Sequence, residues 1–266
     1  MNRIFPRVSS AVLRLSEIAR VVPVNSCYHY RGFRYGGYRN NPYEDYIVGL
    51  AHKENIESLR WRFAEIVLGC RPKSISDALQ LELGEWPLWE FPWSRAPGTR
   101  QSIADPKDNP DVMCHYCEKG VLASHINREF GWLEAAFESI RVTGYRPREY
   151  GFVRCVELLS VGKQSAFLVL DGNHRISALH ALGAQSIEVK VARVQRVKRE
   201  TVHRWPRVRD GSMSPSQALQ VFDRYFRSDN PVLERMNRAE LIADEVPLWE
   251  TIAPASIRQN TLGHFS

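Results

Sequence analysis

The order of apolar and polar positions predicts its clearest run of elements in the second half of the chain. Residues 167–170 are all apolar, which indicates a buried strand. The turn dipeptide Asp171-Gly172 ends this run. Apolar residues then recur at helical spacing up to Gly183, which suits a helix C-cap. Every second residue is apolar over 187–191, as in a half-buried strand. The sequence thus predicts strand, turn, helix and strand in succession.

The same spacing rules place further elements on either side. Helical periodicity predicts helices at residues 52–69 and 125–142, and a mainly apolar run predicts a strand at 152–159. Ser214-Pro215 and Asn230-Pro231 each combine a capping residue with a first-turn proline, so each is expected to begin a helix. This mixture of strands and helices predicts an α/β fold of the mixed, α+β kind.

The junction between the strand and the helix carries the most promising chemistry. Asp171, Gly172, Asn173, His174 and Arg175 lie where free backbone N–H groups and the positive end of the helix dipole favour anions. The planar fork of Arg175 suits phosphate oxygens. In the alternative interpretation, Asp171 caps the helix and Arg175 is solvated. We favour an anion site, because the whole pentad with its flanking strand and helix is far less common than a lone Asp-Gly turn.

The motif Asp-Gly-Asn-His-Arg, followed by Ala-Leu-x-x-Leu-Gly and a strand, resembles the ParB/sulfiredoxin superfamily over about residues 105–195. Sulfiredoxins carry Gly-Gly-Cys-His-Arg, and Asn173 in place of the nucleophilic Cys excludes their thiol chemistry. Chromosome-partition ParB proteins carry Gly-Glu-Arg-Arg and bind CTP. The Asp-Gly-His-x-Arg form of free-serine kinases fits best, through Asp171, Gly172 and Arg175. The resemblance implies a ParB/sulfiredoxin-like core in the order helix, glycine turn, strand, strand, helix, strand, with N- and C-terminal helical extensions.

The resemblance also implies an activity, namely phosphoryl transfer from a nucleotide to a small hydroxylated acceptor. A nucleoside di- or triphosphate (ATP, ADP or CTP) with Mg²⁺ would then be the cofactor. Its phosphates would rest on Gly172, Asn173, His174 and Arg175, and the last two would stabilise charge on the transferred group. Asp171 would hold Mg²⁺ or orient the acceptor.

Glu129 is a candidate catalytic base. At 100° per residue it flanks the apolar face of the predicted helix 125–142, whereas the other charged residues of that helix lie well away from this face. A carboxylate at a buried edge can be tuned towards a base.

Two other functions are compatible with the same motif. The first is a non-catalytic ParB-like regulator, which binds nucleic acid or uses a nucleotide as a switch. The basic run 193–209 is the candidate surface for nucleic acid, although such a run is most often a solvated face. The second is a degenerate domain that serves a biosynthetic complex and binds no nucleotide.

The distribution of charge and the cysteine content indicate where in the cell the protein is expected to act. The net charge of +6 is local, because residues 1–39 and 193–209 each hold seven basic residues against one Glu. The five cysteines are odd in number and lack framework spacing, which favours a reducing, cytoplasmic location. No apolar run approaches the roughly 20 residues needed to span a bilayer, so no membrane association is expected. The sequence does not predict an oligomeric state.

Three segments are expected. Residues 1–104 form a helical extension rich in Tyr, Arg and Trp, residues 105–195 form the core, and residues 196–266 form a basic segment with a C-terminal helical appendage. Within the first segment, residues 25–48 hold six of the ten tyrosines among arginines and glycines. Such residues can stack on bases or sugars. The favoured interpretation is a hairpin-like surface segment whose tyrosines pack on the core.

Overall fold

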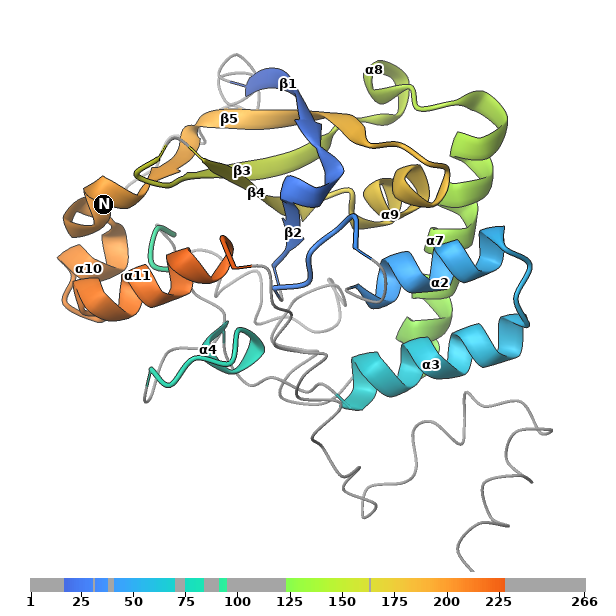
Figure 1. Ribbon diagram of the computed structural model, residues 1–266, viewed down its shortest axis with the longest axis horizontal. Coiled ribbons are helices and arrows are strands. Elements are labelled where there is room, and N and C mark those ends of the chain that lie inside the picture. Colours follow the sequence, from blue (N-terminus) through green and yellow to red (C-terminus); the bar gives the residue numbers. More distant parts are fainter. Residues whose placement is uncertain are drawn as a thin grey trace, which may run out of the picture.

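The structure, a computed structural model, describes residues 17–30, 32–37, 41–69, 75–83, 91–94, 123–162 and 164–227. A mixed β-sheet forms the upper side of this part of the chain in Figure 1. Within these residues the sheet has five strands in the order β1-β5-β3-β4-β2. The strands are β1 (Glu17–Pro23), β2 (Cys27–His29), β3 (Val153–Leu159), β4 (Ser165–Asp171) and β5 (Ser186–Lys198). β1 pairs with β5 and β3 with β4 in antiparallel fashion, whereas β3 with β5 and β2 with β4 are parallel. The predicted mixed α/β class is confirmed.

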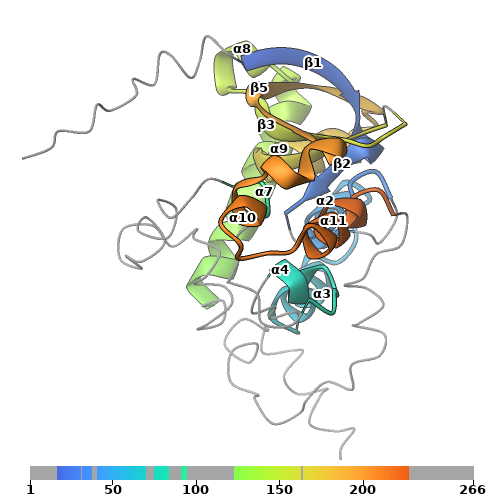
Figure 2. The same cartoon turned by 90° about the vertical axis from the view of Figure 1, so that its left-hand side faces the viewer.

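Helices pack around this sheet. They are α2 (Pro42–Ala51), α3 (Ile56–Gly69), α4 (Ile75–Ala78), α7 (Ala123–Thr143), α8 (Pro147–Tyr150), α9 (Asn173–Ala181), α10 (Pro206–Arg209) and α11 (Pro215–Arg224), with 3₁₀ turns η1 (Val24–Ser26) and η2 (Arg199–Arg204). α9 packs against α7 and α2, and α2 against α3. In Figures 1 and 2 the sheet lies above α2, α3, α4 and α11. Among the described helices, none combines the length and the apolar character needed to cross a membrane.

The strand β4 is buried on both faces of the sheet, as its continuous apolar run predicts. Phe167 and Val169 belong to the same buried cluster as Ile176 of α9. Ala166 and Leu168 point to the opposite face and join the larger cluster that α2, α3, α7 and α11 complete. This central position fixes where β4 ends and α9 begins.

Most elements predicted from apolar spacing are present. The helix predicted at 125–142 is α7, the strand at 152–159 is β3, and the strand-turn-helix-strand unit is β4, α9 and β5. The helix predicted at 52–69 is α3, which starts later, at Ile56. Ser214 and Gln217 form a capping box at the start of α11. The helix predicted after Asn230-Pro231 lies outside the described residues.

Two features of the predicted segmentation need correction. The boundary placed after residue 195 falls inside β5, which runs on to Lys198 because the buried side chain of Val197 continues the strand. The N-terminal segment is also more than a helical extension, since it supplies β1 and β2, the two outer strands of the sheet. β1 pairs with β5 from Glu17 opposite Ala192 to Pro23 opposite Ser186. β1 shows no clear alternation of apolar and polar residues, and β2 lies in the segment that was expected to be hairpin-like but not to join the sheet.

The tyrosine-rich segment, residues 25–48, matches the favoured interpretation only in part, because its residues from Pro42 onward form the start of α2 and not a hairpin. β2 turns back on itself, with His29 N donating to Phe33 O (2.7 Å) and Tyr35 N donating to Cys27 O (3.0 Å). The described tyrosines of this segment are mostly buried: Tyr28, Tyr35, Tyr43 and Tyr46. Tyr38 lies outside the described residues.

Candidate functional site

The turn between β4 and α9 requires glycine at position 172. Gly172 has φ +97° and is the N-cap of α9. A Cβ at this position would lie 3.0 Å from Val153 and 3.2 Å from the guanidinium of Arg175. The N-cap is Gly172 and the Asp171 carboxylate accepts from Arg175, so the alternative in which Asp171 is the cap is wrong. The first regular helical bond is donated by Ile176 N to Gly172 O (3.0 Å). The amides of Asn173, His174 and Arg175 therefore precede the regular bonding pattern, at the positive end of the helix.

The helices α9 and α7 bring His174 and Glu129 together. His174 Nε2 lies 2.7 Å from Glu129 Oε2. Glu129 is 7% exposed, which confirms its predicted place at the buried edge of α7. The His174 side chain stays 28% exposed, so it can reach both the carboxylate and a ligand. Both residues were candidates from the sequence, but their contact was not predicted.

Aromatic rings flank His174 on two sides. Its ring centroid is 6.3 Å from that of Tyr43 and 5.8 Å from that of Trp132. Tyr43 in turn stacks on His29 at 5.2 Å. Trp132 remains 39% exposed. Tyr43 and Trp132 were not candidates from the sequence, although Trp132 follows Glu129 by one helical turn, a spacing that places two side chains side by side.

Asn173 ties the tyrosine-rich hairpin to the start of α9. The hydroxyl of Tyr35 donates to Asn173 Oδ1 at 2.7 Å. Burial, with the Glu44 carboxylate nearby, holds the pKa of Tyr35 well above its usual range, so the hydroxyl remains a neutral donor. This bond fixes the orientation of the Asn173 side chain, so its Nδ2 group and its backbone amide are the donors that remain for a ligand.

Arg175 is directed differently from the prediction. Its Nη1 donates to Gly151 O in the turn before β3, and its Nη2 donates to Asp171 Oδ2 at 3.1 Å. The positive φ of Gly151 (+92°) belongs to that turn and presents the carbonyl. The fork therefore clamps α9 to the turn before β3, whereas the sequence led us to expect it to face a phosphate.

Asp171 is the carboxylate closest to the start of α9 along the chain. Its side chain is 64% exposed, and only Oδ2 contacts Arg175. Within the described residues no group of three or more His, Cys, Asp or Glu side chains is placed to hold a metal ion. Proteins commonly hold nucleotide-bound Mg²⁺ through one or two carboxylates, with phosphates and water completing the shell. Asp171 fits such a site as one ligand, through Oδ1.

A second contact between a histidine and a glutamate, His180 and Glu44, joins α9 to α2. His180 Nδ1 lies 2.8 Å from Oε1 of Glu44, which is 1% exposed. Both oxygens of Glu44 also accept from Gly36 N, at 3.0 and 3.1 Å. The Glu44 carboxylate thus joins α2, α9 and the tyrosine-rich hairpin.

This contact predicts a pH dependence of stability. The Glu44 carboxylate, 2.8 Å from His180 Nδ1, raises the pKa of His180 above 6.5, against an opposing effect of burial. The contact between protonated His180 and Glu44 therefore contributes fully to the free energy of unfolding below about pH 6.5, the pKa of a histidine in an unfolded chain. This contribution is lost as the pH rises through the raised pKa of His180 in the folded state. Urea unfolding between pH 6 and 9 should show the free energy of unfolding of the parent falling relative to that of His180→Gln. Parallel pH profiles for the two proteins would contradict this prediction.

Three of the six basic side chains described in the basic segment are ion-paired, namely Arg196, Arg199 and Arg207. Arg196 Nε donates to Glu157 Oε2 at 2.6 Å, and Arg199 makes a two-bond contact with Asp223 at 2.7 and 2.8 Å. Glu157, on β3, is 1% exposed and also accepts from Arg20 of β1. Cations paired in this way attract phosphates less than free ones. The segment thus offers a weaker surface for nucleic acid than its composition suggests.

Comparison of the chain with protein-family models, with curated proteins and with solved structures gives no significant match. The expected element order, from α7 through β3, β4 and α9 to β5, is present. The resemblance to the ParB/sulfiredoxin superfamily remains a prediction from the motif at residues 171–175.

Proposed function

We propose that the protein binds a nucleotide at the start of α9 and transfers its phosphoryl group to a small hydroxylated acceptor. The observation that supports this most directly is the contact of His174 with Glu129, 2.7 Å long, at the N-terminal end of a helix. The helix end favours phosphate, and the His–Glu pair supplies a proton acceptor beside it. The fold alone would not suggest this function.

The proton transfer follows from the hydrogen bond. An ionised Glu129 accepts only, so His174 Nε2 carries the hydrogen of this bond and Nδ1 holds the lone pair. Nδ1 then takes the proton of the acceptor hydroxyl while the hydroxyl oxygen attacks the terminal phosphorus of the nucleotide. The bond between this phosphorus and the bridging oxygen breaks, and the shortened nucleotide leaves with that oxygen. Glu129 stabilises the imidazolium that forms. Glu129, the base expected from the sequence, becomes the residue that orients the base.

The other motif residues support this step. The backbone amides of residues 173–175 lie where they can donate to phosphate oxygens. Mg²⁺ bound with the nucleotide would neutralise phosphate charge, and Asp171 is the residue that would hold it. Arg175 keeps Asp171 and the helix start in place through its contacts with Asp171 and Gly151.

The proposal predicts that a nucleotide stabilises the fold. Thermal unfolding with ATP, ADP, CTP and GTP, each with Mg²⁺, should show a shift for at least one of them. A ligand at about 100 times its Kd adds roughly 2.7 kcal/mol. The nucleotide that binds is then incubated with free serine, threonine and glycerol, and ³¹P NMR detects the new phosphate ester.

Two outcomes would count against the proposal. If none of the four nucleotides shifts the transition at millimolar concentration, the site does not bind nucleotides. Binding without any transfer to the acceptors would favour the nucleotide-switch alternative.

A further inference from the structure

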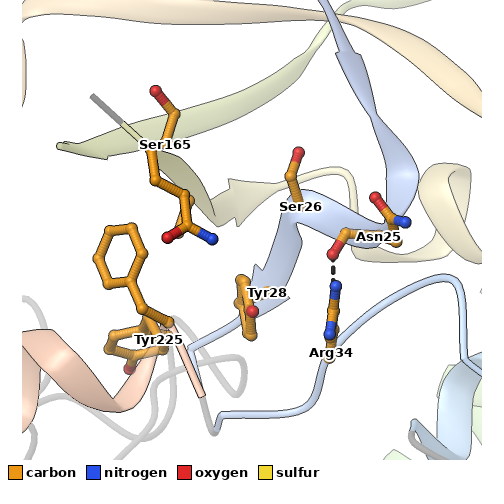
Figure 3. A pocket seen from close by; sticks show the side chains of 9 residues that line it. Asn25, Ser26, Tyr28, Arg34, Ser165 and Tyr225 are labelled. Carbon is orange, nitrogen blue, oxygen red and sulfur yellow. Dashed lines mark hydrogen bonds between the residues drawn. The ribbon is translucent and has the colours of Figure 1, made fainter. Parts of the chain in front are cut away.

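A cavity of about 230 Å³ lies at the other end of β4 from the α9 site (Figure 3). Its walls come from Ser26 and Tyr28 around the start of β2, from Ser165 at the start of β4, and from Tyr225 and Phe226 after α11. β4 has seven residues, so the cavity lies roughly 20 Å from Asp171 at about 3.3 Å per residue. It is therefore a separate site from the one proposed to bind a nucleotide.

Arg34 supplies the charge of this cavity. The hairpin places it opposite Tyr28 through an isolated β-bridge. Its Nε donates to Asn25 O at 2.7 Å, and its guanidinium carbon lies 6.0 Å from the centre of the Tyr28 ring. These contacts hold the group in place and leave its two terminal nitrogens for other acceptors. Arg34 makes no ion pair within the described residues, and none of the described residues that line the cavity is acidic. The cavity thus favours an anion.

The other walls of the cavity also favour a particular shape of ligand and particular hydrogen-bonding groups on it. Tyr28 and Tyr225 meet edge to face with ring centroids 5.8 Å apart, and Phe226 lies beside them. Such walls suit a flat apolar body. The Ser26 hydroxyl already donates to Pro23 O (2.7 Å) and that of Ser165 to Glu157 Oε1 (3.3 Å). Both therefore offer oxygen lone pairs, which accept a hydrogen bond from a ligand hydroxyl.

We propose that this cavity binds a small aromatic carboxylate that carries a hydroxyl group. The terminal nitrogens of Arg34 receive the carboxylate, the rings of Tyr28, Tyr225 and Phe226 enclose the aromatic ring, and a serine oxygen accepts from the hydroxyl. The volume is below the roughly 300 Å³ at which pockets for drug-sized ligands begin, so a single-ring acid fits its size.

Isothermal titration of the full chain with 4-hydroxybenzoate tests the proposal, alongside 4-hydroxybenzyl alcohol and inorganic phosphate as probes. We expect saturable binding of 4-hydroxybenzoate and affinity at least about tenfold weaker for the neutral alcohol, since it lacks the charge-assisted contact. Arg34→Gln should weaken 4-hydroxybenzoate by a similar factor. The control Arg62→Gln changes an arginine of α3 that pairs with Glu54, away from the cavity, and should leave the affinity unchanged.

A second variant covers the possibility that Arg34→Gln does not fold. Gln164 is exposed at the cavity, so Gln164→Trp should fold and block it. Lack of saturable binding, equal affinity in Gln164→Trp, or phosphate binding as tight as 4-hydroxybenzoate would each overturn the proposal. His174→Asn should leave 4-hydroxybenzoate binding intact, which separates this test from that of the nucleotide site.

Discussion

Replacing His174 with asparagine is expected to lower the rate of phosphoryl transfer by about 100-fold or more, the low end of what a positioned general base contributes. Asparagine has no basic nitrogen to take the acceptor proton. The fold should persist, because the side chain is 28% exposed and its main contact is with Glu129. The rate and the melting temperature are measured on the same preparation.

Companion variants make this prediction specific. Glu129→Gln retains an oxygen that can accept from Nε2 but removes the negative charge, so we expect a smaller loss of rate and an altered pH–rate profile. Because the two residues act as one unit, the double variant should lose little more than His174→Asn alone. His203→Asn changes an exposed histidine on η2 and should leave the rate unchanged. A near-parental rate in His174→Asn would contradict the proposed mechanism.

Removing the Glu157 carboxylate is expected to cost about 3 kcal/mol of unfolding free energy, the lower end of the range for breaking a buried ion pair. Glu157→Ala leaves Arg20 and Arg196 together without their counter-charge. The cost stays at the lower end because both arginine side chains are about one-third exposed and can turn towards water. Urea unfolding measures the loss.

The control for this variant is Glu138→Ala. Glu138 forms an ion pair with Arg141 on the surface of α7, where both side chains are more than half exposed. Its removal should leave the unfolding midpoint unchanged, since solvent screens such pairs. Equal effects of the two substitutions would show that burial does not set the strength of the Glu157 cluster.

Local periodicity predicted the elements that build the site but not their contacts. The 3.6-residue spacing of α7 placed Glu129 at the buried edge, and the apolar run of β4 fixed the start of α9. Both predictions depend only on residues that lie close together in the sequence. The contact of Glu129 with His174 joins two helices far apart in the chain, and no local pattern encodes it.

The direction of the Arg175 side chain was predicted wrongly for the same reason, since it depends on a contact between residues far apart in the chain. Its motif position correctly places it in the first turn of α9. The direction of the Arg175 side chain depends on its hydrogen bond to the carbonyl oxygen of Gly151. This oxygen lies beside Arg175 only once the turn before β3 has folded. Similarly, β2 has only three residues and is defined by its pairing with β4.

The outer strands also bear on how the chain acquires its fold during synthesis. β1 and β2 leave the ribosome long before their partners β5 and β4 have been made. Until then, Val22 and Cys27, both buried in the finished sheet, have no strand to pair with. Pairings of such long sequence separation give a high contact order, which slows folding. The sheet can therefore be completed only after translation has passed β5, and β1 has no partner strand until that moment.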